Sequence, residues 1–190
     1  MSFNGGKDCT VVLDVFCGEI EGFRSASCSA EGSRWPAFYV PTQSPFEEVD
    51  TFIDQCADRY PIKVERCEST DLRQEFEFFL KAHPKVTAVI VGVRRTDPYC
   101  ADLQTFDQTD NDWPEFTRIH PILDWSYHDV WCYLRTFKVP YCPLYDEGYT
   151  SLGDRTKTVK NPFLQDQITG EYRPAYLLGD ESLERAGRLS

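Results

Sequence analysis

The segment Ser2-Phe3-Asn4-Gly5-Gly6-Lys7-Asp8 decides how the beginning of this chain folds. Its two adjacent glycines allow the backbone to turn tightly and to approach a ligand closely. Asp8 suits the start of a helix, whose body we expect over residues 9–16. A glycine turn that opens a helix gathers N–H groups at the positive end of the helix dipole. The segment therefore predicts a phosphate-binding loop, to which Lys7 adds a positive charge.

The spacing of this segment differs from that of the common nucleoside-triphosphate loop. That loop has four residues between its glycines and a Ser or Thr after its Lys, whereas here Gly5 and Gly6 are adjacent and Asp8 follows Lys7. An ordinary turn before a helix is the alternative interpretation, because glycine pairs are common in turns. The rest of the chain decides between the two.

Composition excludes several classes of protein. The length of 190 residues predicts one domain, and the net charge of −11 argues against nucleic-acid binding, which needs a basic face. We find neither an apolar run long enough for a membrane span nor a secretory signal. The eight cysteines form no C-x-x-C pair, so we expect reduced thiols rather than a metal site. These features predict a cytoplasmic protein, with mitochondrial and nuclear forms left open.

The hydrophobic pattern alternates between helices and strands, which predicts a parallel, twisted α/β sheet with helices on both faces. We expect strands at residues 38–40, 62–64, 86–93 and 119–123, and helices capped by Ser44, by Ser69 or Thr70, and by Ser126. The unbroken apolar run at 86–93 is typical of a strand that is buried on both faces. A surface loop is expected at 20–34.

Details of the helices follow from capping and periodicity. For the helix after Ser44 we expect Pro45 at the first position and Glu47 as the capping-box partner, and for the helix after Ser126 we expect Asp129 in that role. The expected inner faces are Phe46, Val49, Ile53, Cys56 and Ala57 in the second helix, Leu72, Phe76, Phe79 and Leu80 in the third, and Val130, Trp131, Leu134 and Phe137 in the fourth.

The polar residues 94–114 interrupt this alternation after the central strand. Ligands of open α/β sheets bind beyond the carboxyl ends of the strands, so this loop is a candidate wall of the site. Residues 154–190 are expected to form an irregular C-terminal extension.

Three further motifs accompany the glycine segment: Gly92-Val93-Arg94-Arg95-Thr96-Asp97-Pro98, Asp124-Trp125, and the stretch 140–153, which contains Pro-Leu-Tyr-Asp-Glu-Gly-Tyr-Thr-Ser-Leu-Gly. Together they resemble the eukaryotic FAD synthase domain, an FMN adenylyltransferase of the adenine-nucleotide α-hydrolase and sulfate-reductase-like superfamily. The resemblance implies a single domain over 1–190 with that fold. In the family a strand precedes the pyrophosphate loop, whereas here Met1 precedes Ser2, so we expect an N-terminally shortened chain without its first strand.

The resemblance also implies the reaction, which converts ATP and FMN to FAD and pyrophosphate with Mg²⁺ held mainly by the substrate phosphates. It implies an ATP side made of Ser2, Phe3, Asn4, Gly5, Gly6, Lys7, Asp8 and Gly92. It implies a flavin side, with 94–114 as the flavin-side loop, made of Arg95, Thr96, Asp97, Asp110, Trp113, Arg185 and Arg188. Asn4, Asp8, Arg94 and Asp97 are the implied catalytic residues. The sequence leaves open which of Arg94 and Arg95 enters the site.

The implied partners are the small molecules ATP and FMN, with transient contact with flavoproteins that receive FAD, and neither nucleic acid nor membrane. Two alternatives stay open. One is an inactive or regulatory form that binds nucleotide or flavin without turnover, because the strand before the loop is absent. The other is an adenylylsulfate-type reductase. It is less favoured because such an enzyme needs a C-terminal thiol, and no cysteine follows Cys142 in this sequence.

Overall fold

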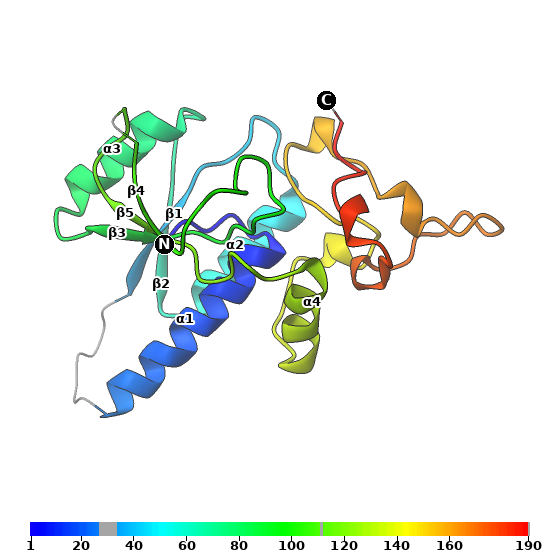
Figure 1. Ribbon diagram of the computed structural model, residues 1–190, viewed down its shortest axis with the longest axis horizontal. Helices are drawn as coiled ribbons and strands as arrows, with labels where there is room; N and C mark the ends of the chain where they lie inside the picture. Colours follow the sequence, from blue (N-terminus) through cyan, green and yellow to red (C-terminus); the bar gives the residue numbers. More distant parts are fainter. Residues whose placement is uncertain (27–33, 111, 190) are drawn as a thin grey trace.

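The computed structural model describes residues 1–26, 34–110 and 112–189. Its α-helices are α1 (Lys7–Ala26), α2 (Glu47–Arg59), α3 (Leu72–Ala82) and α4 (Tyr127–Thr136). Its strands are β1 (Trp35–Tyr39), β2 (Ile62–Arg66), β3 (Ala88–Ile90), β4 (Phe106–Gln108) and β5 (Thr117–Ile119). The strands gather in one half of the molecule, with α1 and α2 beside them and the C-terminal segment on the far side of α4 (Figure 1).

The strands form two small sheets. β1 pairs with β2 in parallel, and β3 pairs with β5 in parallel. This arrangement confirms the predicted α/β class with parallel strands. β4 adds an antiparallel edge to β5, and it lies inside the region 94–114 that was predicted as a loop.

Residues 1–3 connect these two sheets. The amide of Phe3 donates to the carbonyl of Phe38 at 2.9 Å, and the amide of Ser2 donates to the carbonyl of Ile90 at the same distance. The α-ammonium of Met1 donates to Pro36 O, and burial lowers the pKa of that group to about 6. The glycine loop therefore leaves the sheet between β1 and β3. That a first strand is missing stays a prediction.

Two of the predicted boundaries are wrong. α1 continues through residues 20–26, which were predicted as loop, while 27–33 lie outside the described residues. β3 covers three of the eight residues predicted as a strand, and only Val89 is fully buried, so the strand is not buried on both faces. It ends at Ile90 because the following backbone packs against the start of α1, as described below.

Capping was predicted correctly for one helix out of three. Ser126 and Asp129 form the expected capping box of α4. α2 begins after Phe46 without a side-chain cap, so Ser44 lies two residues before the N-cap and Pro45 is not in the helix. The amide of Ser44 donates to the carboxylate of Asp154 at 2.9 Å. α3 is capped by Asp71, whose carboxylate accepts from two amides of the first turn, and not by the residues before it.

The predicted inner faces and the last strand also need correction. Phe52 of α2 is buried although it was not predicted to be, whereas Leu72 and Phe137 are 44% and 66% exposed because they lie at helix ends. The residues Ile122 and Leu123 are buried, but they lie in a turn before α4, and the strand β5 ends at Ile119.

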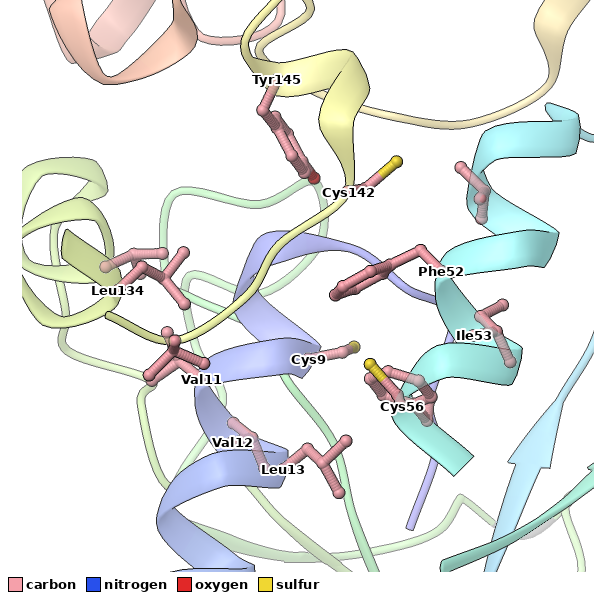
Figure 2. Packing of buried hydrophobic residues seen from close by; sticks show 14 of the residues in the cluster. Cys9, Val11, Val12, Leu13, Phe52, Ile53, Cys56, Leu134, Cys142 and Tyr145 are labelled. Carbon is pink, nitrogen blue, oxygen red and sulfur yellow. The ribbon is translucent and has the colours of Figure 1, made fainter. Parts of the chain in front are cut away.

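The main core lies between α1, α2 and α4 (Figure 2). Cys9 of α1, Cys56 of α2 and the nearby Cys142 contribute thiols to this apolar interior. Burial raises the pKa of Cys9 and of Cys56 to about 12, so both thiols stay protonated at neutral pH. None of the seven cysteines in the described ranges forms a disulfide.

The segment after α4 contains short 3₁₀ helices. Those in the described part of the chain are Pro143–Tyr145, Arg155–Lys157, Pro162–Leu164, Ala175–Leu177 and Glu181–Leu183. The segment returns to the body of the protein, since the amide of Arg155 donates to the carbonyl of Ser44 at 2.8 Å. Of the helices described, none combines the length and the apolar character needed to cross a bilayer.

Candidate active site

The glycine loop is held in shape by its own side chains and by one tyrosine. Gly5 has φ of 71°, a conformation that side chains disfavour. The amide of Gly6 donates to Asn4 Oδ1 at 3.0 Å, and the amide of Lys7 donates to the hydroxyl of Tyr145 at 2.9 Å. The turn thus leads directly into α1, as the sequence predicted.

A polar cavity of about 200 Å³ opens beside this loop. Three other segments complete its wall: the end of the β3 segment, the stretch after Tyr145, and the C-terminal tail. The lining residues are Asn4, Gly6, Lys7, Asp8, Cys9, Gly92, Val93, Asp97, Tyr145, Ser151, Leu152, Glu184, Arg185 and Arg188. The cavity is therefore built from residues that lie more than 180 positions apart in the chain.

Gly92 brings the β3 segment against the start of α1. A Cβ atom at this position would lie 2.8 Å from both Cα and N of Cys9. Both neighbours are backbone atoms of a buried helix, so neither can move aside cheaply. The close approach explains why a glycine follows the strand.

We expect Gly92→Ala to lower the free energy of unfolding by about 1–3 kcal/mol, the usual cost of overpacking, and to weaken nucleotide binding because the loop is displaced. Gly18→Ala is the matched control, since Gly18 lies within α1 with open space around it. That control is expected to raise the free energy of unfolding by about 0.5–1 kcal/mol. Chemical denaturation measures both. Equal stability of the two variants would contradict the close approach.

A cluster of four charged groups lies at the cavity wall, with Lys7, Asp8 and Glu184 in the lining and Arg94 behind them. Lys7 Nζ binds Asp8 Oδ2 at 3.0 Å and a carboxylate oxygen of Glu184. Arg94 Nε binds Asp8 Oδ1 at 2.6 Å, and its Nη2 lies 2.7 and 2.6 Å from the two carboxylate oxygens of Glu184. Lys7 and Arg94 are 2% and 1% exposed, so the two cations and two anions form a neutral, buried set.

The pKa values in this cluster favour the charged forms. Burial opposes the charge on Asp8, but Lys7 and Arg94 more than compensate and lower its pKa. Burial likewise opposes the charge on Lys7, and Asp8 and Glu184 raise its pKa above the ordinary value. The attraction of Asp8 and Glu184 also outweighs burial at Arg94, whose pKa is raised. All three groups are therefore ionised at neutral pH.

The structure places the predicted ATP-side residues unevenly. Asn4, Gly6, Asp8 and Gly92 line the cavity. Lys7 also reaches its wall, but its ammonium is buried, 5.2 Å from the ring centre of Tyr127, and paired with carboxylates. The loop residues Ser2, Phe3 and Gly5 are not in the cavity lining, since they pair with the sheet or pack on α2.

The structure also separates the two adjacent arginines. Arg94 points into the buried cluster, whereas Arg95 binds Asp124 Oδ1 and the carbonyls of Ala101 and Leu103. Arg95 thus holds the 94–105 loop in place. Its predicted contact with flavin has no support from its position.

The other flavin-side residues fall into two groups. Asp97 lines the cavity and accepts from the amide of Arg94 at 2.9 Å, and Thr96 accepts from the guanidinium of Arg94 at 3.3 Å. Asp110 is exposed and Trp113 packs edge-on against Phe76, outside the cavity lining. The structure therefore does not bring Asp110 and Trp113 to the loop, and their contact with flavin stays a prediction.

Arg185 and Arg188 both reach the cavity although the tail is not an α-helix. The amide of Arg188 donates to the carbonyl of Arg185 at 2.9 Å, so a turn places both on one side. Arg188 Nη1 donates to the carbonyl of Leu152 at 2.8 Å. Burial and the neighbouring Arg185 lower the pKa of Arg188.

Six residues of the cavity lining were not predicted from the sequence, and two of them, Tyr145 and Glu184, contact the glycine loop. Tyr145 belongs to one of the motifs, but no local pattern indicates that its hydroxyl accepts a hydrogen bond from the glycine loop. Glu184 stood within the tail, where an acidic residue beside an arginine is typically solvated. Its burial at 8% exposure depends on long-range contacts that no local pattern encodes.

Comparisons with known proteins agree with this geometry. Residues 1–160 match the phosphoadenosine phosphosulfate reductase domain family. A probable FAD synthase of Schizosaccharomyces pombe is 42% identical over 188 residues, which cover 99% of this chain and 70% of that protein. The chain belongs to the FAD synthase family. A second probable FAD synthase, from Caenorhabditis briggsae, is 40% identical, but there the match covers 36% of the longer relative.

A solved structure supports the family fold. The FMN adenylyltransferase of Candida glabrata, in complex with FAD and inorganic pyrophosphate, matches this FAD synthase family member with a TM-score of 0.89 and 27% identity. The match covers 100% of this chain and 78% of that one. The fold expected from the resemblance is thus confirmed.

Proposed function

We propose that this FAD synthase family member transfers AMP from ATP to FMN, giving FAD and pyrophosphate. The observation that carries the proposal is the shared cavity, in which the glycine loop faces Arg185 and Arg188. The glycine loop at the N-terminus of α1 forms one part of the cavity lining, and the two guanidinium groups of the tail belong to another. Such an arrangement suits two polyanions that must be brought together.

The reaction needs positioning more than covalent chemistry. A phosphate oxygen of FMN attacks the α-phosphorus of ATP, a new P–O bond forms, and the bond to pyrophosphate breaks. We assign the departing phosphates to Asn4 and the backbone of the glycine loop, and the FMN phosphate to Arg185 and Arg188. To Asp97 we assign the orientation of a ribose, a flavin group or a metal-bound water.

A second, smaller cavity of about 90 Å³ adjoins the glycine loop. Asn4, Gly6 and Leu152 contribute to both cavities, and the remainder of the smaller one includes Phe46 and Val49. An apolar recess next to a phosphate-binding loop suits the base of a nucleotide. We assign the adenine ring to this recess.

We propose Mg²⁺ as the metal of this reaction, where it would neutralise negative charge on the substrate phosphates. The carboxylates of Asp8 and Glu184 are engaged by Lys7 and Arg94. Within the ranges that the structure describes, no group of three or more His, Cys, Asp or Glu side chains is placed to hold a metal. We therefore propose that the substrate phosphates provide most of the Mg²⁺ ligands.

The curated relatives are longer than this chain. This chain spans 70% of the S. pombe relative and 36% of the C. briggsae relative. We propose a cytoplasmic location and transient transfer of FAD to flavoproteins, which fractionation and pull-down of apo-flavoproteins test.

The decisive experiment incubates the protein with ATP, Mg²⁺ and FMN and separates the flavins by chromatography. We expect FAD and pyrophosphate in equal amounts. Binding of both ligands without FAD would support the inactive or regulatory form instead. Reduction of an adenylylsulfate would support the reductase alternative instead. That alternative needs a C-terminal thiol, and this sequence has no cysteine after Cys142.

A further inference from the structure

Among the described residues of the tail, Glu184 is the one that contacts both Lys7 of the glycine loop and Arg94, which follows β3. Its carboxylate binds both Lys7 and Arg94. It directly precedes Arg185, and Arg188 follows four residues later. Movement of Glu184 therefore changes the position of both groups that face the cavity.

Hydrogen bonds to the backbone of the tail also hold it in place at Glu184. The hydroxyl of Thr150 donates to the carbonyl of Glu184 at 2.6 Å. The amide of the Asn161 side chain donates to Thr150 at 2.9 Å and to the carbonyl of Leu183 at 2.8 Å. Thr150 and Asn161 are fully buried, so this support is rigid.

The negative charge of Glu184 also balances the buried cluster. With Glu184 ionised, the cluster holds two cations and two anions. Without that charge, Lys7 and Arg94 would share the single carboxylate of Asp8, and a buried positive charge would be left uncompensated. Asp8 and Lys7 belong to the first turn of α1, so this imbalance would act on the glycine loop.

We propose that Glu184 is a positioning residue that fixes the glycine loop and the two tail arginines to each other. It touches neither substrate in this assignment. It acts through Lys7 and Arg94 on the nucleotide side and through Arg185 and Arg188 on the flavin side. The inference rests on the proposed function, because it assumes that the two parts of the cavity lining bind ATP and FMN.

The test replaces Glu184 by Gln, which keeps the shape and removes the charge. FMN binding is measured by flavin fluorescence, and binding of a non-hydrolysable ATP analogue by calorimetry. We expect Glu184→Gln to weaken both ligands by about tenfold or more, because small displacements of positioning groups have effects of this size. Glu171→Gln is the matched control, since Glu171 is an exposed glutamate elsewhere in the C-terminal segment.

A second variant guards against misfolding of the first. Lys7→Gln combined with Glu184→Gln restores a balanced cluster of Arg94 and Asp8, so it removes the uncompensated charge. We expect the double variant to fold, as measured by circular dichroism, and still to bind both ligands weakly. Glu184→Asp keeps the charge and is expected to recover part of the affinity.

Three results overturn the inference. Wild-type affinity for both ligands in folded Glu184→Gln, or in the folded double variant, would show that Glu184 fixes nothing. Loss of affinity for only one ligand would show that Glu184 does not join the two parts of the lining. A wild-type protein that binds neither ATP analogue nor FMN overturns the proposed function and this inference with it.

Discussion

Asp8→Ala is expected to lower turnover in FAD synthesis by more than about tenfold, a barrier increase above roughly 1.4 kcal/mol. Asp8 lies in the cavity wall and is bound by Lys7 and Arg94. Its removal leaves two buried cations facing the single carboxylate of Glu184. Breaking a buried ion pair in this way also lowers the free energy of unfolding by about 3 kcal/mol.

The matched control for this variant is Asp14→Ala on the same helix. Asp14 accepts hydrogen bonds from the hydroxyls of Tyr60 and Tyr133, at 2.7 and 2.9 Å, away from the cavity. That variant is expected to lose stability but to keep its turnover at temperatures where it is folded. Steady-state kinetics and thermal melting separate the two effects. Full turnover in Asp8→Ala, with only a lower melting temperature, would indicate that Asp8 merely stabilises the start of the helix.

The lowered pKa of Asp8 has a consequence for acid stability. A carboxyl group with a folded pKa below its unfolded value of about 3.9 contributes stability above that pH. The contribution is lost as the pH falls through the folded pKa. We therefore expect the difference in unfolding free energy between wild type and Asp8→Ala to have its full value at pH 7. This difference should decrease in strong acid, where Asp8 becomes protonated.

Replacing Arg185 and Arg188 together by Ala is expected to weaken FMN binding by about 100-fold. Each guanidinium is placed to donate charged hydrogen bonds to the FMN phosphate, and such a bond contributes about 1.5 kcal/mol or more. Binding of ATP is expected to change little, since the glycine loop and the cluster behind it keep their contacts. Flavin fluorescence measures the first effect and calorimetry with an ATP analogue measures the second.

The double variant Arg155→Ala and Arg173→Ala provides the matched control. Both residues are exposed in the same C-terminal segment, outside the cavity lining, and the variant removes the same two positive charges. Wild-type FMN affinity in this control, with weak affinity in the first variant, would exclude a general effect of net charge. An unchanged dissociation constant in the Arg185 and Arg188 variant would contradict our assignment of the tail.

The sequence by itself determined the features that depend on local chemistry. Adjacent glycines before Lys7 specified the turn that opens α1, because glycine alone adopts the left-handed conformation of Gly5 without strain. Ser126 and Asp129 specified the start of α4, because a capping box needs only a spacing of three residues. Motif resemblance then indicated the family and most of the residues that line the cavity.

Only the tertiary structure decided the features that depend on distant residues. It turned Arg94 inward and Arg95 outward, although the two are neighbours in sequence, because Asp8 and Glu184 lie on one side and Asp124 on the other. It buried Lys7 and Glu184 against each other across 177 positions of the chain. It placed Ser44 before the N-cap of α2, where its amide donates to the carboxylate of Asp154, 110 positions away. The physical reason is common to all three cases: a charged or polar group is stabilised by whichever partner the fold brings near, and local sequence does not encode that partner.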